Sequence, residues 1–176
     1  NEHGTDEDYS YSCNGSFTVG NTTIHCHNNK SHGTQTLKQA FANSCNSAYS
    51  SMGLDLDITQ FAKLCDSLLF NTSLPTKFES SKSSFVLQSS DGDASTMSTS
   101  IGQGKTLVTP FHMALIVSAI ANDGVLMQPY VIDYTETYEG TVHEQNEPET
   151  YKQLISSENA AVLQEYMSAV VQNGTG

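Results

Sequence analysis

Residues 36–49 place the strongest constraint on the fold, because they combine a helix start, an apolar helix face and a polar corner. Thr36 followed by Gln39 has the spacing of a capping box, in which two side chains close the first turn of a helix. The apolar residues that follow lie near helical spacing, so one face should be buried: Leu37, Ala40, Phe41 and Ala48. We expect one helix that runs to about Ser44 and a short second helix that ends at Gly53.

The polar corner is the triplet Ser44-Cys45-Asn46, which offers one hydroxyl and one carboxamide close together. Ser and Asn favour helix ends because their side chains hydrogen-bond to nearby backbone groups, so the triplet fits a helix-capping corner. It also fits a chemical site. The triplet alone favours the capping interpretation, and the case for chemistry depends on the residues around it.

The composition excludes several classes of partner. The chain has 19 Asp and Glu against 7 Lys, no Arg, and a net charge of −12. Nucleic acids and anionic membranes need cationic contacts, so neither is an expected partner. No apolar run approaches the roughly 18 residues of a membrane span, and no signal peptide is expected. The length of 176 residues suits one domain with its own core, so residues 1–176 are predicted to form a single domain.

The N-terminal part predicts a β-hairpin that carries two cysteines. Residues 1–12 contain no apolar anchor and are expected to be a loose end. The β-rich residues 17–24 surround Gly20-Asn21, a two-residue turn signal. The resulting register places Cys13 and Cys26 on one face, one diagonal step apart, near the reach of an undistorted disulfide. A disulfide and two small buried hydrophobic side chains both fit this pattern. Either way, we expect a close pair of sulfur atoms.

The sequence predicts neither a metal site nor a cofactor. The cysteines lack the Cys-x-x-Cys spacing of a structural zinc site, and they stand at Cys13, Cys26, Cys45 and Cys65. His25 and His27 share the opposite face of the hairpin, with His32 close by. No acidic or Cys ligand lies at a fixed spacing from these histidines, so a histidine-based metal site is not expected.

The middle of the chain predicts a helix followed by a long loop. Asp57 and Gln60 repeat the capping pattern at the start of an amphipathic helix that reaches residue 68. Residues 71–100 are rich in Ser, Thr and Asp, which predicts a long surface loop with a short strand near residues 84–88. A loop of this length in a compact domain is more often functional than idle.

The remaining segments predict two further helices and short strands. Thr109-Pro110 starts a helix that is apolar nearly all round and should therefore be central and buried, and Gly124 follows its end. Strands are expected at residues 125–127 and 130–134, with a turn at 139–140. A last helix begins after Ser156 or Ser157 and stops at Asn173-Gly174. The predicted fold class is α+β, mostly helical, with a small β-hairpin and short strands.

Several segments, taken in order, resemble the transpeptidase domain of penicillin-binding proteins, a serine acyl-transferase with a β-lactamase-like fold. From the first to the last, the matching segments span about four fifths of the chain. They are His32-Gly33-Thr34 through Asn46, Ile101-Gly102-Gln103-Gly104 with Thr109-Pro110-Phe111-His112-Met113-Ala114, Ile120-Ala121-Asn122-Asp123-Gly124, Met127-Gln128-Pro129-Tyr130, and Met167 through Gly176.

This family works with the motifs Ser-x-x-Lys, Ser-x-Asn and Lys-Thr-Gly. Only the middle motif is present, as Ser44-Cys45-Asn46, and the sequence contains no Ser-x-x-Lys. Lys105-Thr106-Leu107 resembles Lys-Thr-Gly superficially but stands where the family has no catalytic triplet. In family order the nucleophile would precede Asn1 and Lys-Thr-Gly would follow Gly176. The resemblance therefore implies a middle section of a partial β-lactamase/transpeptidase-like fold.

The resemblance also implies roles for the triplet. Ser44 would relay a proton towards the leaving group, and Asn46 would present its amide to the substrate backbone and to the catalytic Lys. Cys45 would point into the core. The intact protein would be a membrane-anchored D,D-transpeptidase at the extracytoplasmic face of a bacterial membrane.

That enzyme would bind peptidoglycan stem peptides ending in D-Ala-D-Ala, and β-lactams, through a serine acyl-enzyme. The chain as given is expected to be inactive and to make no membrane contact. The alternative is a β-lactam-sensing or non-catalytic binding module of the same fold.

Overall fold

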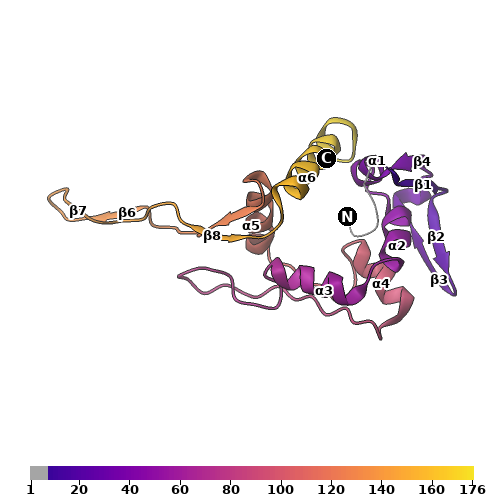
Figure 1. The fold of residues 1–176 in the computed structure, drawn as a ribbon, viewed down its shortest axis with the longest axis horizontal. Helices are drawn as coiled ribbons and strands as arrows, with labels where there is room; N and C mark the ends of the chain where they lie inside the picture. Colours follow the sequence, from indigo (N-terminus) through magenta and orange to yellow (C-terminus); the bar gives the residue numbers. More distant parts are fainter. Residues whose placement is uncertain (1–7) are drawn as a thin grey trace.

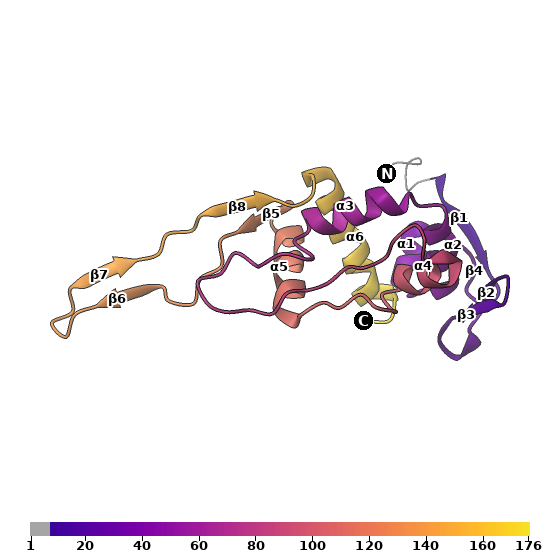
Figure 2. The same cartoon turned by 90° about the horizontal axis from the view of Figure 1, so that it is seen from below.

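The computed structural model describes residues 8–176 and shows an elongated molecule (Figures 1 and 2). The helices are α1 (Leu37–Ala42), α2 (Asn46–Leu54), α3 (Ile58–Ser67), α4 (Gly92–Ser100), α5 (Pro110–Ala121) and α6 (Ser157–Asn173). The strands are β1 (Ser10–Cys13), β2 (Ser16–Val19), β3 (Thr22–His25), β4 (Gly33–Thr36), β5 (Val125–Met127), β6 (Tyr134–Glu136), β7 (Val142–Gln145) and β8 (Thr150–Gln153). A 3-10 turn, η2 (His27–Asn29), follows β3.

Small antiparallel pairs take the place of a central sheet in the described part of the chain. The pairs are β1–β4, β2–β3, β5–β8 and β6–β7. Strands β1 to β4 lie beside α1 and α2 at one end of the molecule, and the β6–β7 hairpin extends away at the other end (Figure 1). This arrangement confirms the predicted α+β class in which helices predominate.

The N-terminal hairpin has the predicted register, with Phe17 opposite Ile24 and Val19 opposite Thr22. The prediction of a loose end at residues 1–12 is wrong for residues 10–12, which form β1 together with Cys13 and pair with β4. Backbone pairing with β4 and the packing of Tyr11 against the buried cysteine core anchor this segment. Residues 1–7 lie outside the described part of the structure.

The predicted helix starts are confirmed by their capping hydrogen bonds. Thr36 and Gln39 form both bonds of the capping box. The Asp57 side chain accepts from the backbone N–H groups of the first turn of α3. Thr109 and Ser156 cap α5 and α6 in the same way. These side chains satisfy donors that have no partner inside the helix, which is why local sequence predicts them well.

Helix α4 was not expected, because it occupies the end of the predicted loop at residues 71–100. Its sequence is mostly Ser and Thr and contains one large apolar residue, Met97, which is fully buried. Ser50 of α2 donates a hydrogen bond from its hydroxyl to the Met97 carbonyl at 3.4 Å. Packing against α2 therefore decides the helical state here, since the sequence has no apolar periodicity. The predicted strand near residues 84–88 is reduced to a single bridge between Ser84 and Leu107.

Helix α5 is less buried than its composition suggests. One face, formed by His112, Leu115 and Ala119, is buried, but Met113 is 43% exposed and Val117 is 39% exposed. Its buried face joins a core with residues of β5 and the neighbouring loops: Leu69, Leu74, Leu126 and Leu154. The prediction that this helix is central and buried therefore holds for one face only.

The C-terminal strands differ in part from prediction. β5 is confirmed, whereas the strand expected at residues 130–134 begins only at Tyr134 and continues to Glu136. The turn at residues 139–140 is confirmed between β6 and β7, where Gly140 donates a hydrogen bond to the Thr137 carbonyl. β8 was not expected. Its residues are exposed, so no buried face marks it in the sequence.

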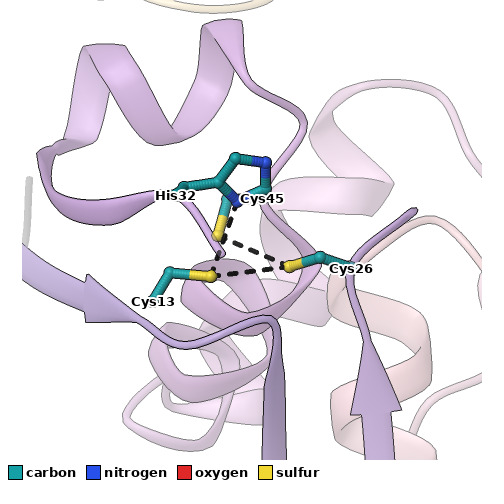
Figure 3. Close-up of side chains that lie close together, drawn as sticks. All are labelled: Cys13, Cys26, His32 and Cys45. Carbon is teal, nitrogen blue, oxygen red and sulfur yellow. Dashed lines mark hydrogen bonds between the residues drawn. The ribbon is translucent and has the colours of Figure 1, made fainter. Parts of the chain in front are cut away.

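Helix α1 contacts both the N-terminal strands and α6. A core of Cys13, Cys26, Cys45, Ala40 and Ala48 joins the N-terminal strands to α1 and α2. Figure 3 shows the three cysteines of this core. Helix α6 packs against α1, where the ring centroids of Phe41 and Tyr166 lie 5.8 Å apart.

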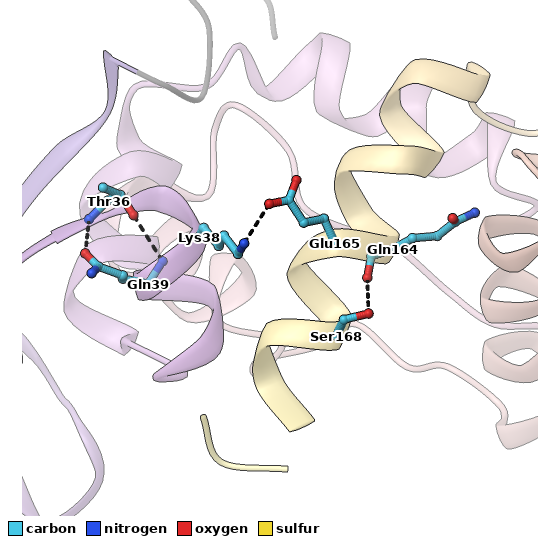
Figure 4. Close-up of polar contacts among 6 residues, drawn as sticks. All are labelled: Thr36, Lys38, Gln39, Gln164, Glu165 and Ser168. Atoms are coloured by element: carbon cyan, nitrogen blue, oxygen red, sulfur yellow. Dashed lines mark hydrogen bonds and ion pairs between the residues drawn. The ribbon is translucent and has the colours of Figure 1, made fainter. Parts of the chain in front are cut away.

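Lys38 of α1 forms an ion pair with Glu165 of α6 at 2.6 Å (Figure 4). Both side chains are largely exposed, so this pair contributes at most about 1 kcal/mol. The apolar contacts therefore carry more of the α1–α6 interaction than the ion pair does.

A glycine permits the close approach of β2 to η2. Gly15 has φ 98°, and a Cβ at this position would collide with the Asn29 carbonyl oxygen. Gly20 has φ 56° but open space around it. Gly20→Ala should lose about 1 kcal/mol from left-handed strain alone. Gly15→Ala should lose about 3 kcal/mol or more, because collision adds to strain. Urea unfolding followed by circular dichroism measures both, and equal losses would contradict a constraint at Asn29.

Candidate functional site

Ser44 stands in the short connection between α1 and α2, with its side chain exposed. Its φ of 50° is left-handed, and the flanking backbone is held by hydrogen bonds from Ser44 N–H to the Phe41 carbonyl and from Cys45 N–H to the Ala40 carbonyl. The N-cap residue of α2 is Cys45, which makes no side-chain capping bond. The Ser44 hydroxyl instead lies 2.9 Å from the Thr175 hydroxyl. The helix-capping interpretation is therefore wrong for Ser44.

Asn46 is the first residue of α2 and is half-buried. Its side-chain Nδ2 donates a hydrogen bond to the His25 carbonyl at 2.9 Å. This bond ties the start of α2 to the end of β3, so Asn46 holds the corner in place. The carboxamide has a second N–H and a carbonyl oxygen, which gives it capacity for further partners.

A cleft of about 420 Å³ lies beside Ser44. Its lining residues come from two parts of the chain, which are called its two walls. One consists of His27, Lys30, His32, Asn43 and Ser44, and the other of Asn173, Gly174 and Thr175. The C-terminal segment runs close to α1, since Thr175 N–H donates to the Ala42 carbonyl at 3.2 Å. A Cβ at Gly174 would collide with that same carbonyl. A glycine is thus required where the two walls of the cleft meet.

Ser44 and Asn46 of the triplet lie differently with respect to the cleft. Ser44 lines the cleft, together with Lys30, which can supply a positive charge there. Asn46 is not among the residues that line it and faces β3 instead. The structure therefore brings Ser44 and Thr175 together, whereas Asn46 contacts the end of β3.

The sequence did not reveal a second cluster of side chains, which includes Cys45, the residue after Ser44. The side chains of Cys13, Cys26, His32 and Cys45 converge, with ligand atoms all within 4.8 Å of one another. The expected close sulfur pair is confirmed, because the Cys13 and Cys26 Sγ atoms lie 3.7 Å apart, and both thiols are free.

The cysteines of this cluster lack Cys-x-x-Cys spacing, so no metal site was expected, but the tertiary structure brings them together with His32. His25 and His27, which were considered as ligands, lie outside the cluster and are exposed. The sequence did contain a signal for this cluster. Cys13 and Cys26 share one face of the hairpin, and Cys45 was expected to point into the core.

The thiols of this cluster differ in acidity. Burial raises the pKa of Cys45 to about 12. Burial also opposes ionisation of Cys13, but hydrogen bonds from the backbone N–H groups of His32 and Gly15 outweigh it and lower the pKa of Cys13 to about 6. Cys13 thus ionises more readily than Cys45.

The cleft thus brings Ser44 of the Ser-x-Asn triplet next to Gly174 and Thr175 near the end of the chain. The family model of the penicillin-binding protein transpeptidase domain matches residues 1–176, so the chain belongs to this family. None of the helices in residues 8–176 combines the length and apolar character needed to cross a bilayer.

Two curated relatives illustrate the similarity. The chain is 30% identical over 142 residues to the peptidoglycan D,D-transpeptidase PbpA of Mycolicibacterium smegmatis, which covers 79% of this chain and 28% of that protein. It is 28% identical over 165 residues to stage V sporulation protein D of Bacillus subtilis, which covers 92% of this chain and 25% of that protein. The chain thus spans about a quarter of the length of these relatives.

Solved structures agree with the fold. The D,D-transpeptidase domain of a peptidoglycan glycosyltransferase from Eggerthella lenta superposes with a TM-score of 0.85 at 27% identity, over 97% of this chain and 44% of that one. Penicillin-binding protein A from M. tuberculosis, as a penicillin G acyl-enzyme complex, gives a TM-score of 0.84 at 21% identity, over 98% of this chain and 41% of that one.

The left-handed conformation of Ser44 predicts an unusual response to glycine. Left-handed backbone is unfavourable by roughly 1–2 kcal/mol for a residue with a Cβ, and glycine adopts it freely. Ser44→Gly should therefore be at least as stable as Ser44→Ala, whereas glycine is about 1 kcal/mol worse than alanine in a helix interior. As a helical control, Ser95→Gly in α4 should be less stable than Ser95→Ala. Thermal and urea unfolding decide the comparison, and a Ser44→Gly variant clearly weaker than Ser44→Ala would contradict it.

Proposed function

We propose that this chain forms the Ser-x-Asn side of the active site of a serine-type D,D-transpeptidase. The intact enzyme cross-links peptidoglycan stem peptides that end in D-Ala-D-Ala and reacts covalently with β-lactams. One observation carries the proposal: the hydroxyls of Ser44 and Thr175 lie 2.9 Å apart and line the same cleft, although the two residues are 131 positions apart in the sequence. Family membership and the named activity of PbpA support the reaction class.

In this mechanism Ser44 moves a proton and does not attack the substrate. An acyl transfer needs a proton taken from the nucleophile and given to the leaving group. A hydroxyl suits a relay because it donates and accepts at once, and Thr175 offers a second hydroxyl at hydrogen-bond distance. An unactivated serine is a weak nucleophile, and the 176 residues contain no Ser-x-x-Lys that would activate one.

Asn46 has a positioning role and a binding role in the proposal. The bond to the His25 carbonyl uses one N–H of the carboxamide and fixes its orientation. The second N–H and the carbonyl oxygen can then meet the substrate backbone and the catalytic Lys of the intact enzyme. Residues 1–176 act as a single domain in this proposal, within a protein that works at the extracytoplasmic face of a bacterial membrane to which it is anchored.

Labelled penicillin tests the roles in the full-length protein that carries this chain. Ser44→Ala should slow acylation on the order of 100-fold, because general acid–base groups contribute at least that much. Asn46→Ala should slow it further if the side chain binds both substrate and base. Exposed Ser89 lies outside the cleft, so Ser89→Ala is the matched control and should react at the parental rate. If Ser44→Ala is acylated at the parental rate, Ser44 does not act as the proton relay.

The chain by itself gives a second test. We expect the 176 residues neither to hydrolyse D-Ala-D-Ala peptides nor to be acylated by penicillin, because they contain no Ser-x-x-Lys. Mass spectrometry detects any adduct, and one on Ser44 would overturn the assignment of roles. A full-length protein that is acylated but performs no peptide transfer would instead be the β-lactam-sensing alternative.

A further inference from the structure

We propose that Cys13, Cys26, His32 and Cys45 bind one zinc ion that holds the Ser-x-Asn corner against the N-terminal strands. The ligands come from four places: the end of β1, the residue after β3, the loop before β4 and the start of α2 (Figure 3). In the chain they follow the pattern Cys-x12-Cys-x5-His-x12-Cys.

The separations of the ligand atoms fit a tetrahedral ion. The Sγ atoms of Cys13 and Cys26 lie 3.7 Å apart, and those of Cys26 and Cys45 lie 3.8 Å apart. The Cys13 Sγ and His32 Nδ1 atoms lie 3.5 Å apart. Zn–S bonds of about 2.3 Å and a Zn–N bond of about 2.0–2.1 Å, at tetrahedral angles, require edges of roughly 3.5–3.8 Å. Three of the six edges of a zinc tetrahedron are therefore present, and all four ligand atoms lie within 4.8 Å of one another.

The chemistry of the ligands selects the ion. Soft thiolates with one imidazole in a tetrahedral arrangement favour zinc over the hard cations that prefer oxygen ligands. Because all four ligand atoms lie within 4.8 Å of one another, they surround space for a single ion and not for a metal–sulfur cluster.

The surroundings of the sulfur atoms suit thiolates. Gly15 N–H donates to Cys13 Sγ at 3.3 Å, and the fully buried Ser47 hydroxyl lies 3.2 Å from Cys26 Sγ. Groups of this kind around a metal orient the ligands and tune their charge. The three cysteines are at most 2% exposed and pack against Ala40 and Ala48, which keeps competing water away.

A disulfide explains the cluster less well. Cys26 has two sulfur neighbours at nearly equal distance, Cys13 at 3.7 Å and Cys45 at 3.8 Å, so the geometry favours neither pair. A bridge would also leave one thiol and His32 unexplained. A purely apolar core would not need the imidazole nitrogen aimed at Cys13.

A site with four protein ligands has no open position, so this zinc is structural. Cys45 stands between Ser44 and Asn46, and it is the N-cap of α2 without a side-chain cap. Zinc bound to Cys45 would therefore fix the backbone on both sides of it. This consequence for Ser44 rests on the proposed function, but the binding of zinc does not.

Metal analysis of the full-length protein, purified without chelators, tests the binding. We expect about one zinc per chain, and after zinc removal a tetrahedral thiolate spectrum on addition of Co²⁺. Cys26→Ser and His32→Ala should each lose most of the zinc. Two matched controls should retain it: Cys65→Ser, a buried cysteine outside the cluster, and His25→Ala, an exposed neighbour of Cys26.

A second measurement uses the wild-type protein and does not depend on whether the variants fold. Chelation should remove the zinc, lower the Tm by several degrees and be reversed by added Zn²⁺ but not by Mg²⁺. Absence of zinc from the purified protein, together with no uptake of Zn²⁺ or Co²⁺, would overturn the proposal. Two free thiols instead of four in the denatured, non-reduced chain would overturn it in favour of a disulfide.

Acylation by labelled penicillin tests the consequence for Ser44 separately. Zinc-free protein that remains folded should react about 10- to 100-fold more slowly than the zinc-loaded form, since small displacements of a positioned group have effects of that size. Cys65→Ser should react at the parental rate in the loaded form. Equal rates with and without zinc would remove the positioning role, whereas no acylation of either form would count against the proposed function and leave the metal stoichiometry as evidence.

Discussion

The contact among Cys13, Cys26 and Cys45 is the interaction on which the site depends. These side chains are buried at the junction of β1, the end of β3 and the start of α2, and no other core of the described residues includes the Ser-x-Asn corner. Because Cys45 lies inside the triplet, the same contact that closes this core also fixes Ser44 and Asn46. The sulfur atoms that form this core therefore also position the Ser-x-Asn corner, with or without a bound metal.

The second wall of the cleft depends on a different part of the chain. Helix α6 packs on α1 through Phe41 and Tyr166, and its end delivers Thr175 to Ser44. Gly174 lets this end pass close to the Ala42 carbonyl. The hydroxyl pair at the cleft thus results from helix packing over a long sequence separation. A change in the α1–α6 contact would therefore alter the position of Thr175 relative to Ser44, even though this contact lies outside the triplet.

Local signals in the sequence predicted much of the fold. The capping residues Thr36, Asp57, Thr109 and Ser156 each start a helix as expected, because a cap satisfies donors within one turn of its own position. The Gly20-Asn21 turn likewise set the register of β2 and β3. The ordered motifs also led to the correct family, which the family model confirms. The roles of Ser44 and Asn46 in catalysis stay predictions.

The features that the sequence did not reveal are those that depend on distant partners. Helix α4 has a single large buried side chain, Met97, so only its contact with α2 makes it a helix. β8 is exposed and forms by backbone pairing with β5, which leaves little trace in the side-chain pattern. The sequence by itself determined where helices begin, where the hairpin turns and which motif is present. Only the tertiary structure decided that His32 meets three cysteines and that Ser44 meets Thr175, because ligands and hydroxyls from separate segments converge only when those segments pack.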